Sequence, residues 1–137
     1  MQAGKLKIKS IPRKGRGVVA LKTIRKGEVF EVAPFIPVKS EEAKSLTRTR
    51  LSHYIYSLSR GARALALGFG SLYNHDAKPN ADFKIEERAR VVKFRALRTI
   101  KAGDEITIDY GYDPMDPSTW DSDLRDYQKH AERSRRS

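Results

Sequence analysis

The chain has 137 residues, and its 28 lysine and arginine residues outnumber 17 acidic residues to give a formal net charge of +11. It contains no cysteine, which excludes disulfides, thiolate zinc sites and a cysteine nucleophile, and the spacing of its three histidines predicts no metal site. The sequence has neither the run of about 20 apolar residues that spans a bilayer nor an N-terminal signal peptide. We therefore expect an intracellular, single-domain protein without membrane attachment.

The excess positive charge favours acidic partners, such as nucleic acid or a complex that contains DNA. Part of the charge lies in residues 129–137, which we expect to form a solvated end of the chain. Solubility alone would explain the charge equally well. The charge thus indicates partners rather than chemistry.

A nine-residue segment occurs twice. ALKTIRKGE at 20–28 recurs as ALRTIKAGD at 96–104. Each copy lies between a β-rich run and an alternating strand: 18–19 and 29–32 for the first copy, 91–94 and 106–110 for the second. Glycine supplies the positive φ that such a turn needs, and alternation gives each strand one buried face. The repeat predicts strand, basic turn and strand, twice, in a compact fold of short β-sheets.

Between the copies, residues 40–58 are predicted to be helical. Ser40 can cap this helix, and the two glutamates that follow complement the positive end of its dipole. Four apolar side chains would share one face: Leu51, Tyr54, Ile55 and Leu58. The apolar stretch 62–71, with glycines at 68 and 70, is compatible with a short helix or a buried turn.

Beyond Tyr112, two Asp-Pro pairs interrupt regular structure. Ser118, with Asp121 three residues later, then predicts the cap of a short C-terminal helix. That helix would carry Trp120, Leu124 and Tyr127.

Three patches carry the candidate chemistry. Gly15-Arg16-Gly17 opens the first strand, where such a triplet is usually only a turn. Residues 68–80 place Asn74 beside His75 in an apolar frame, and such a pair is costly to bury unless every polar group is bonded. Residues 103–112 form a strand that ends in Tyr-Gly-Tyr, which is also compatible with an ordinary aromatic strand end.

Together, and in this order, the patches resemble the SET-domain protein lysine methyltransferases. The glycine triplet matches the Gly-x-Gly of that family, residues 74–80 match its Asn-His-Ser-Cys-x-Pro-Asn segment, and residues 105–111 match its Glu-Leu-x-x-x-Tyr-Gly segment. The stretch 66–70 is similar to minimal viral and microbial members. The resemblance predicts a SET domain over 1–120, with a C-terminal helix and basic tail over 121–137.

The resemblance implies a mainly β fold with short helices, in which several small sheets form a β-clip. The segment around Tyr110 would thread beneath the loop that holds Asn74, as a C-terminal pseudoknot, and such threading is rare among folds. In this sequence Asp76 stands in place of the usual serine and Ala77 in place of a cysteine that binds zinc in many relatives. A zinc module therefore cannot close the lysine channel, and the Trp120 segment is the candidate for that role.

The resemblance also implies the roles of individual residues, with S-adenosylmethionine as the cofactor and no metal. Tyr110 would be the catalytic residue, orienting the sulfonium methyl group and the amine. The expected cofactor-binding residues are Gly15, Arg16, Gly17, Tyr54, Asn74, His75 and Trp120. The expected walls of the substrate channel are Tyr73, Phe83 and Tyr112, for which ordinary core packing is an equal alternative.

The expected substrate is a lysine of a histone, a nucleoid protein or another basic protein, in the cytoplasm, the nucleoid or a host nucleus. Nucleic acid would lie nearby, and a homodimer could complete the substrate groove. Two alternatives stay open: a catalytically silent SET-like binding module, against which Tyr110 and the Asn-His pair argue, and a basic nucleic-acid binder. The sequence shows no aromatic ladder and no known DNA-reading motif for the latter.

Overall fold

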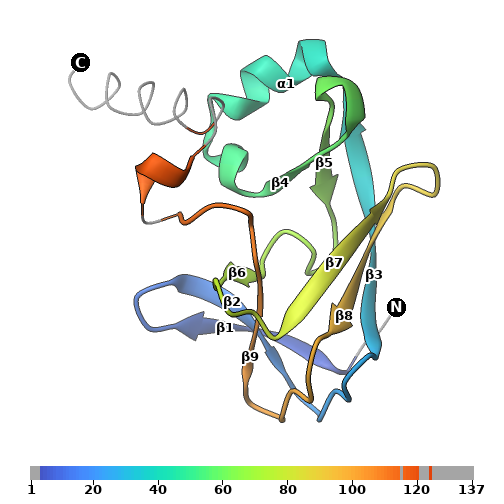
Figure 1. Ribbon diagram of the computed structural model, residues 1–137, viewed down its shortest axis with the longest axis vertical. Coiled ribbons are helices and arrows are strands. Elements are labelled where there is room, and N and C mark those ends of the chain that lie inside the picture. Colours follow the sequence, from blue (N-terminus) through green and yellow to red (C-terminus); the bar gives the residue numbers. More distant parts are fainter. Residues whose placement is uncertain (1–3, 115, 121–123, 125–137) are drawn as a thin grey trace.

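The computed structural model describes residues 4–114, 116–120 and 124 (Figure 1). The strands are β1 (Leu6–Ile11), β2 (Gly15–Ala20), β3 (Val29–Val38), β4 (Ile55–Ser57), β5 (Arg63–Ala66), β6 (Asn74–His75), β7 (Ala81–Glu86), β8 (Val91–Ala96) and β9 (Glu105–Ile108). The helical segments are α1 (Ser40–Thr47) and the 3-10 turns η1 (Arg50–His53), η2 (Ser59–Gly61) and η3 (Pro117–Thr119). The prediction of a mainly β fold with short helices is confirmed.

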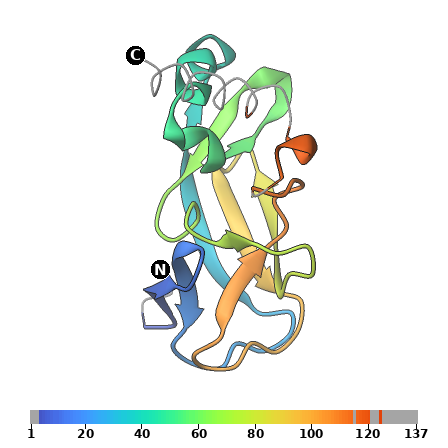
Figure 2. The same ribbon diagram turned by 90° about the vertical axis from the view of Figure 1, so that its left-hand side faces the viewer.

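The first sheet has the strand order β1-β2-β9-β6. Strands β1 and β2 form an antiparallel hairpin, and β9 pairs with β2 through Val18 and Ile106. On its other side β9 runs parallel to β6, with Asn74 opposite Thr107 and His75 opposite Ile108. The late strand β9 is thus inserted between two earlier segments, as expected for the threaded C-terminal arrangement (Figures 1 and 2).

The second sheet has the order β4-β5-β3-β8-β7, and all of its strand pairs are antiparallel. Its longest strand, β3, alternates so that Phe30, Ala33 and Phe35 are buried. A register shift between Val29 and Glu31 marks a bulge, and Glu31 is buried directly after Phe30. A bulge re-aims a side chain in this way. The bulge therefore directs the Glu31 carboxylate into the buried interior.

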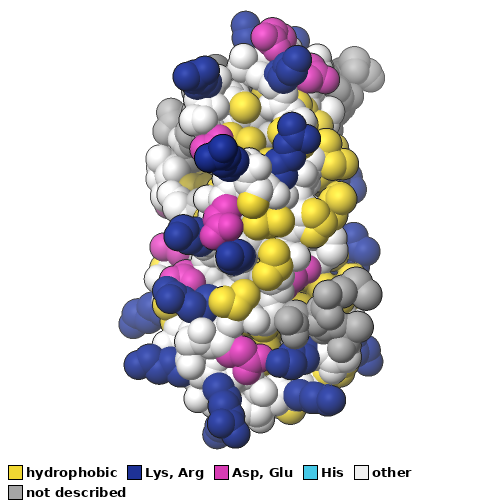
Figure 3. Space-filling model, turned by 90° about the vertical axis from the view of Figure 1, so that its right-hand side faces the viewer, with side chains coloured by type: hydrophobic (Ala, Val, Ile, Leu, Met, Phe, Trp, Pro, Cys, Tyr) yellow, Lys and Arg dark blue, Asp and Glu magenta, His cyan; other side chains and the backbone are white. Residues whose placement is uncertain are grey.

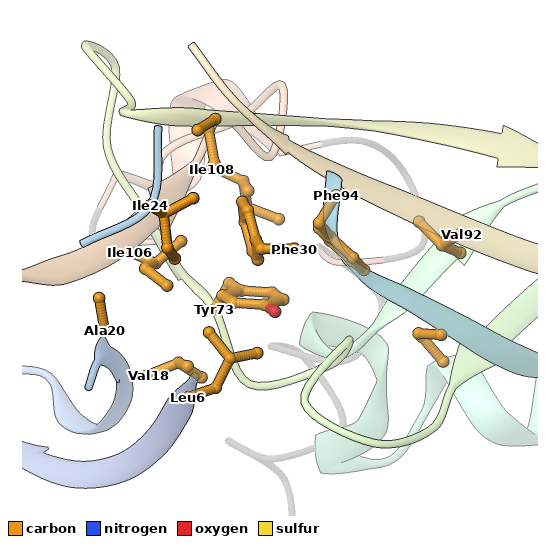
Figure 4. Close-up of a cluster of buried hydrophobic side chains, with 14 of the residues drawn as sticks. Leu6, Val18, Ala20, Ile24, Phe30, Tyr73, Val92, Phe94, Ile106 and Ile108 are labelled. Atoms are coloured by element: carbon orange, nitrogen blue, oxygen red, sulfur yellow. The ribbon is translucent and has the colours of Figure 1, made fainter. Parts of the chain in front are cut away.

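One hydrophobic core joins the two sheets (Figure 4). The largest fully buried side chains are Tyr73, Phe30 and Phe94, and the ring centroids of Tyr73 and Phe94 lie 4.6 Å apart. Burial of one such side chain contributes about 1.5–3 kcal/mol. The core therefore fixes the position of the segment that leads into Asn74.

The single helix predicted over 40–58 is wrong. Helix α1 ends at Thr47, and the chain continues as η1 and then β4. Thr49 explains the break, because its hydroxyl donates to the Leu46 carbonyl and accepts from the Leu51 N–H, which starts a new turn. Ser40 is the first helical residue rather than the cap, and Lys39 at the cap position makes no side-chain capping bond.

The expected apolar face of that helix is wrong for the same reason. Leu51 and Tyr54 are exposed at 39% and 38%. Ile55 instead starts β4, opposite Leu65 of β5. Strand β5 covers the first part of the stretch 62–71, because alternation buries the small side chains of Ala64 and Ala66 against β3 and β4. The second part, residues 68–71, forms a turn, which is one of the two expected alternatives.

At the C-terminal end, Ser118 lies inside η3, and its hydroxyl donates to the Asp116 carboxylate at 2.7 Å. Asp116, not Ser118, therefore caps this turn. Leu124 is buried, while Tyr127 and the rest of the predicted helix and basic tail lie outside the described residues. No helix in the described ranges is long and apolar enough to cross a membrane.

Candidate active site

Two cavities meet beside the pair of strands β6 and β9. The first has a volume of about 340 Å³ and lies next to the β1–β2 turn. Its lining residues are Arg13, Lys14, Gly15, Arg16, His53, Tyr54, Ser71, Leu72, Asn74, His75, Tyr110 and Pro114. It combines basic side chains, aromatic rings and the Asn-His pair. We refer to it as the polar cavity.

The second cavity has a volume of about 250 Å³. It is lined by Thr47, Ser52, His53, Tyr54, Ile55, Tyr56, Ser57, Arg63, Ser71, Tyr73, Phe83, Ile85, Tyr110, Tyr112 and Leu124. We call it the aromatic cavity. Four residues line both cavities: His53, Tyr54, Ser71 and Tyr110. Tyr110 therefore stands where the two spaces adjoin.

Gly17 holds the wall of the polar cavity close to Asn74. A Cβ atom on Gly17 would lie 2.6 Å from a Glu105 carboxylate oxygen and 2.7 Å from the Asn74 amide nitrogen. That amide donates to the Arg16 carbonyl at 3.1 Å and to Glu105 at 2.7 Å, and Lys14 pairs with the same carboxylate at 3.1 Å. Only glycine permits this approach, so the glycine triplet sets the orientation of Asn74.

His75 is held by the backbone of Tyr110, whose N–H donates to His75 Nδ1 at 3.0 Å. This bond fixes the orientation of the ring relative to β9. The Asp109 carboxylate, 3.7 Å from Nδ1, instead accepts from the Gly111 N–H at 2.8 Å. His75 is therefore an oriented ring in the wall of the polar cavity.

The Tyr110 hydroxyl donates to the backbone carbonyl of Tyr73. Burial raises the pKa of Tyr110 above its ordinary value, and the neighbouring Tyr112 and Tyr54 raise it further. The hydroxyl is thus a neutral hydrogen-bond donor at physiological pH, not a base.

Glu31 is a buried carboxylate that bonds to Tyr73, and the sequence did not predict it as part of the site. Glu31 accepts from the Tyr73 hydroxyl at 2.6 Å and from the Phe69 N–H at 2.9 Å. Burial raises the pKa of Glu31, although both hydrogen bonds oppose the shift. Gly68 has a φ of +62°, and a Cβ there would lie 2.6 Å from the Glu31 carboxylate. Glu31 therefore holds the turn that leads into the Asn-His pair.

Aromatic rings line one side of the site from Tyr110 outward. The centroids of Tyr110 and Tyr112 are 5.5 Å apart, and His53 lies 6.1 Å from Tyr112 and 5.0 Å from Trp120. Burial lowers the pKa of His53, so its ring is neutral at physiological pH. Trp120 donates through Nε1 to the Asp113 carbonyl at 2.7 Å. It packs against the site through His53 and is not among the lining residues of either cavity.

The structure brings most of the predicted site residues together. Gly15, Arg16, Asn74 and His75 line the polar cavity; Tyr73, Phe83 and Tyr112 line the aromatic cavity; Tyr54 and Tyr110 line both. Gly17 lies against the Asn74 amide, and Trp120 packs against His53, which lines both cavities. Their roles in binding and catalysis stay predictions.

Sequence reasoning also missed His53 and Tyr56. Both belong to the segment expected as one helix, and no motif marks them. Tyr56 donates to the Gly70 carbonyl at 2.6 Å, which ties β4 to the turn before Asn74. In the part of the chain that the structure describes, no three histidine or carboxylate side chains converge to hold a metal ion.

Comparison with known proteins agrees with this geometry. The family model of the SET domain matches residues 15–111, and the chain therefore belongs to the SET-domain family. The fold, the paired cavities and the family assignment confirm the predicted fold class and the expectation of a SET-domain methyltransferase at the level of the family.

Named relatives are similar to the chain over much of its length. It is 39% identical over 107 residues to the Schizosaccharomyces pombe histone-lysine N-methyltransferase specific for H3 lysine-37, covering 77% of this chain and 73% of that protein. It is 33% identical over 75 residues to the Caenorhabditis briggsae histone-lysine N-methyltransferase Suv4-20, covering 55% of this chain but only 22% of that protein.

A solved structure has the same fold. The crystal structure of a Plasmodium falciparum protein assigned as a histone methyltransferase superposes with a TM-score of 0.67 at 32% identity. The match covers 82% of this chain and 97% of the Plasmodium chain.

Proposed function

We propose that this protein transfers a methyl group from S-adenosylmethionine to the ε-amino group of a lysine in a histone-like protein. The observation that carries the proposal is the position of Tyr110, whose side chain borders both cavities. A cofactor in the polar cavity and a lysine in the aromatic cavity would meet at this residue.

The residues of the polar cavity fit S-adenosylmethionine. Its volume of about 340 Å³ lies in the range of small-molecule sites, about 300–1,000 Å³. Arg13, Lys14 and Arg16 supply positive charge for a carboxylate, and Asn74 and His75 supply polar groups for an amine and a base edge. Gly15, which has no side chain, lines this cavity beside Arg16 and Asn74.

When bound, S-adenosylmethionine supplies a methyl carbon activated by a sulfonium centre, which an amine displaces to leave a thioether. The lysine must first lose a proton to water, against a free pKa of about 10.4. The phenol and imidazole rings of the aromatic cavity exclude water and favour the neutral amine. This arrangement requires no dedicated general base.

Tyr110 contributes alignment. Its hydroxyl is fixed by the Tyr73 carbonyl, and its raised pKa keeps it protonated. A rigid phenol at the junction can hold the amine and the methyl donor in line, and such positioning is worth roughly 7–11 kcal/mol in favourable cases.

The choice of a histone-like substrate rests on the two relatives named as histone-lysine N-methyltransferases. A histone-like substrate would also locate the protein on chromatin, inside a nucleus. The formal charge of +11 is compatible with work beside DNA. A homodimer stays a prediction that analytical ultracentrifugation would test.

The test is incubation with radiolabelled S-adenosylmethionine and mixed histones or nucleoid proteins, followed by mass spectrometry of the labelled product. Wild type should label a lysine, and Tyr110→Phe should not, although both bind the cofactor in calorimetry. Equal labelling by the variant would contradict the role of Tyr110. Absence of cofactor binding by wild type would contradict the proposed function itself.

A further inference from the structure

The two copies of the repeated segment meet in space and pair with each other. Ile24 of the first copy and Ile100 of the second exchange both backbone hydrogen bonds at 2.8 Å, in an isolated antiparallel bridge. Both side chains are fully buried. The repeat thus builds one joint structure, which we call the paired turns (residues 20–28 and 96–104).

The hydrogen bonds of the paired turns obey an internal twofold relationship. Every backbone hydrogen bond between the two copies has a counterpart at the corresponding positions. The matched bonds are Ala20 N–H to Asp104 O (3.0 Å) with Ala96 N–H to Glu28 O (2.9 Å), and Gly103 N–H to Ala20 O (2.7 Å) with Gly27 N–H to Ala96 O (2.8 Å). Side chains at equivalent positions are therefore related by a local twofold axis through the Ile24–Ile100 bridge.

Two pairs of cations follow this symmetry. Lys22 corresponds to Arg98, and Arg25 corresponds to Lys101. All four are exposed, and none forms an ion pair with another residue in the described ranges. Lys26 adds a fifth exposed cation on one side only.

The paired turns lie at the end of the molecule opposite α1 in both ribbon views (Figures 1 and 2). Lysine and arginine side chains lie at that end of the visible face in Figure 3, as they do over the rest of the face. None of these four cations lines the polar or the aromatic cavity. The surface is therefore separate from the candidate active site.

We propose that the paired turns form a docking surface for the phosphate backbone of duplex DNA. Duplex DNA carries one charge per about 1.7 Å of axis, and binding releases counterions for every phosphate that a cation neutralises. Twofold protein surfaces match the twofold symmetry of the duplex. A local twofold set of cations that form no ion pair in the described ranges can present equivalent charges to the two strands of a duplex. The proposed contacts are to phosphates, so binding should not depend on the base sequence.

This inference goes beyond the proposed function and is tested without methyl transfer. Binding of the full chain to a duplex of roughly 20 base pairs is measured by fluorescence anisotropy over a range of salt concentrations. The two half-surface variants are Lys22→Gln with Arg25→Gln, and Arg98→Gln with Lys101→Gln. The matched control, Lys84→Gln with Arg88→Gln, removes the same charges from the β7–β8 hairpin, where both cations are exposed.

Each half-surface variant should bind DNA about tenfold more weakly and lower the salt slope by about 1.8, since each phosphate contact contributes about 0.9. The control should retain wild-type affinity to within about twofold. Because Arg98 also donates to the Pro79 carbonyl at 3.0 Å, the single variants Arg25→Gln and Lys101→Gln serve as a second symmetric pair if that double variant unfolds.

Equal weakening by all three double variants would show an effect of net charge alone and would overturn the proposal. The same holds if no variant weakens binding, or if only one half of the surface matters. Poly-L-glutamate is the probe for an acidic protein partner. If it binds as tightly as DNA at the same salt and depends on the same four cations, the surface serves an acidic protein and the proposal is wrong.

Discussion

The Tyr110 hydroxyl donates its hydrogen bond to the backbone carbonyl of Tyr73, the residue directly before Asn74 and His75. The backbone N–H of Tyr110 bonds in turn to the His75 ring. Tyr110 is therefore attached at both ends to the segment that forms the wall of the polar cavity. A shift of that segment would move the hydroxyl and the cavity wall together.

Glu31 and Tyr73 should be coupled energetically. Tyr73→Phe removes the hydroxyl that bonds the buried Glu31 carboxylate and should lower the free energy of unfolding by about 1–3 kcal/mol. Combined with Glu31→Gln, it should cost less than the sum of the single changes, because the shared bond can be lost only once. Urea denaturation measures both effects. Tyr54→Phe is the control, because Tyr54 is 38% exposed. Additive losses in the double variant would contradict the coupling.

The raised pKa of Glu31 predicts a pH dependence of stability. Since folding favours the protonated form, this contribution is fully present below the unfolded value of 4.5 and is lost as pH rises through the folded pKa. The stability of wild type relative to Glu31→Gln should therefore fall as pH rises from 4.5 through the raised folded pKa of Glu31. Glutamine can still accept from the Phe69 N–H, so the variant should fold. A difference that stays constant with pH would contradict this account.

Local signals in the sequence predict the fold and the candidate site where glycine and alternation are decisive. The basic turns after 18–19 and 91–94, Asn74 beside His75 and the strand into Tyr110 lie as expected. Each is a short segment whose geometry depends on its own residues. The glycine triplet opens β2 and not the first strand as expected, because β1 precedes it and pairs with it.

The rest depends on contacts between segments distant in sequence. The bond between Glu31 and Tyr73 joins residues 42 positions apart, and a bulge, not a propensity, turns Glu31 inward. The helix expected over 40–58 stops early because Thr49 bonds to both of its neighbouring turns. Local patterns cannot reveal which of several compatible hydrogen bonds a threonine makes.

Gly17→Ala should weaken the binding of S-adenosylmethionine about tenfold or more. The new Cβ would lie 2.7 Å from the Asn74 amide and 2.6 Å from the Glu105 carboxylate, so the Asn74 side chain in the cavity wall and the Glu105 side chain bonded to it must both shift. A shift of about 1 Å in a positioned group can cost roughly 100-fold in rate. Isothermal titration calorimetry measures the affinity.

The control for this change is Gly27→Ala. Its φ of +85° makes alanine strained, but no atom lies within 4 Å of the new Cβ. It should lower stability by about 1–2 kcal/mol and leave cofactor affinity unchanged. Similar affinity losses in the two variants would attribute the effect to general destabilisation and contradict the steric argument.

The rate of methyl transfer should rise with pH without a descending limb up to about pH 10. The rise follows deprotonation of the substrate lysine, whose free pKa is about 10.4. Tyr110 does not oppose it, because burial raises the pKa of its hydroxyl above the ordinary value of 10.0 and keeps it a donor throughout this range. Initial rates on a lysine peptide give the profile, and the absorbance difference between wild type and Tyr110→Phe reports tyrosinate. A decline in rate below about pH 9 with a matching tyrosinate signal would show that Tyr110 ionises in this range. That result would contradict the assignment of Tyr110 as a neutral hydrogen-bond donor.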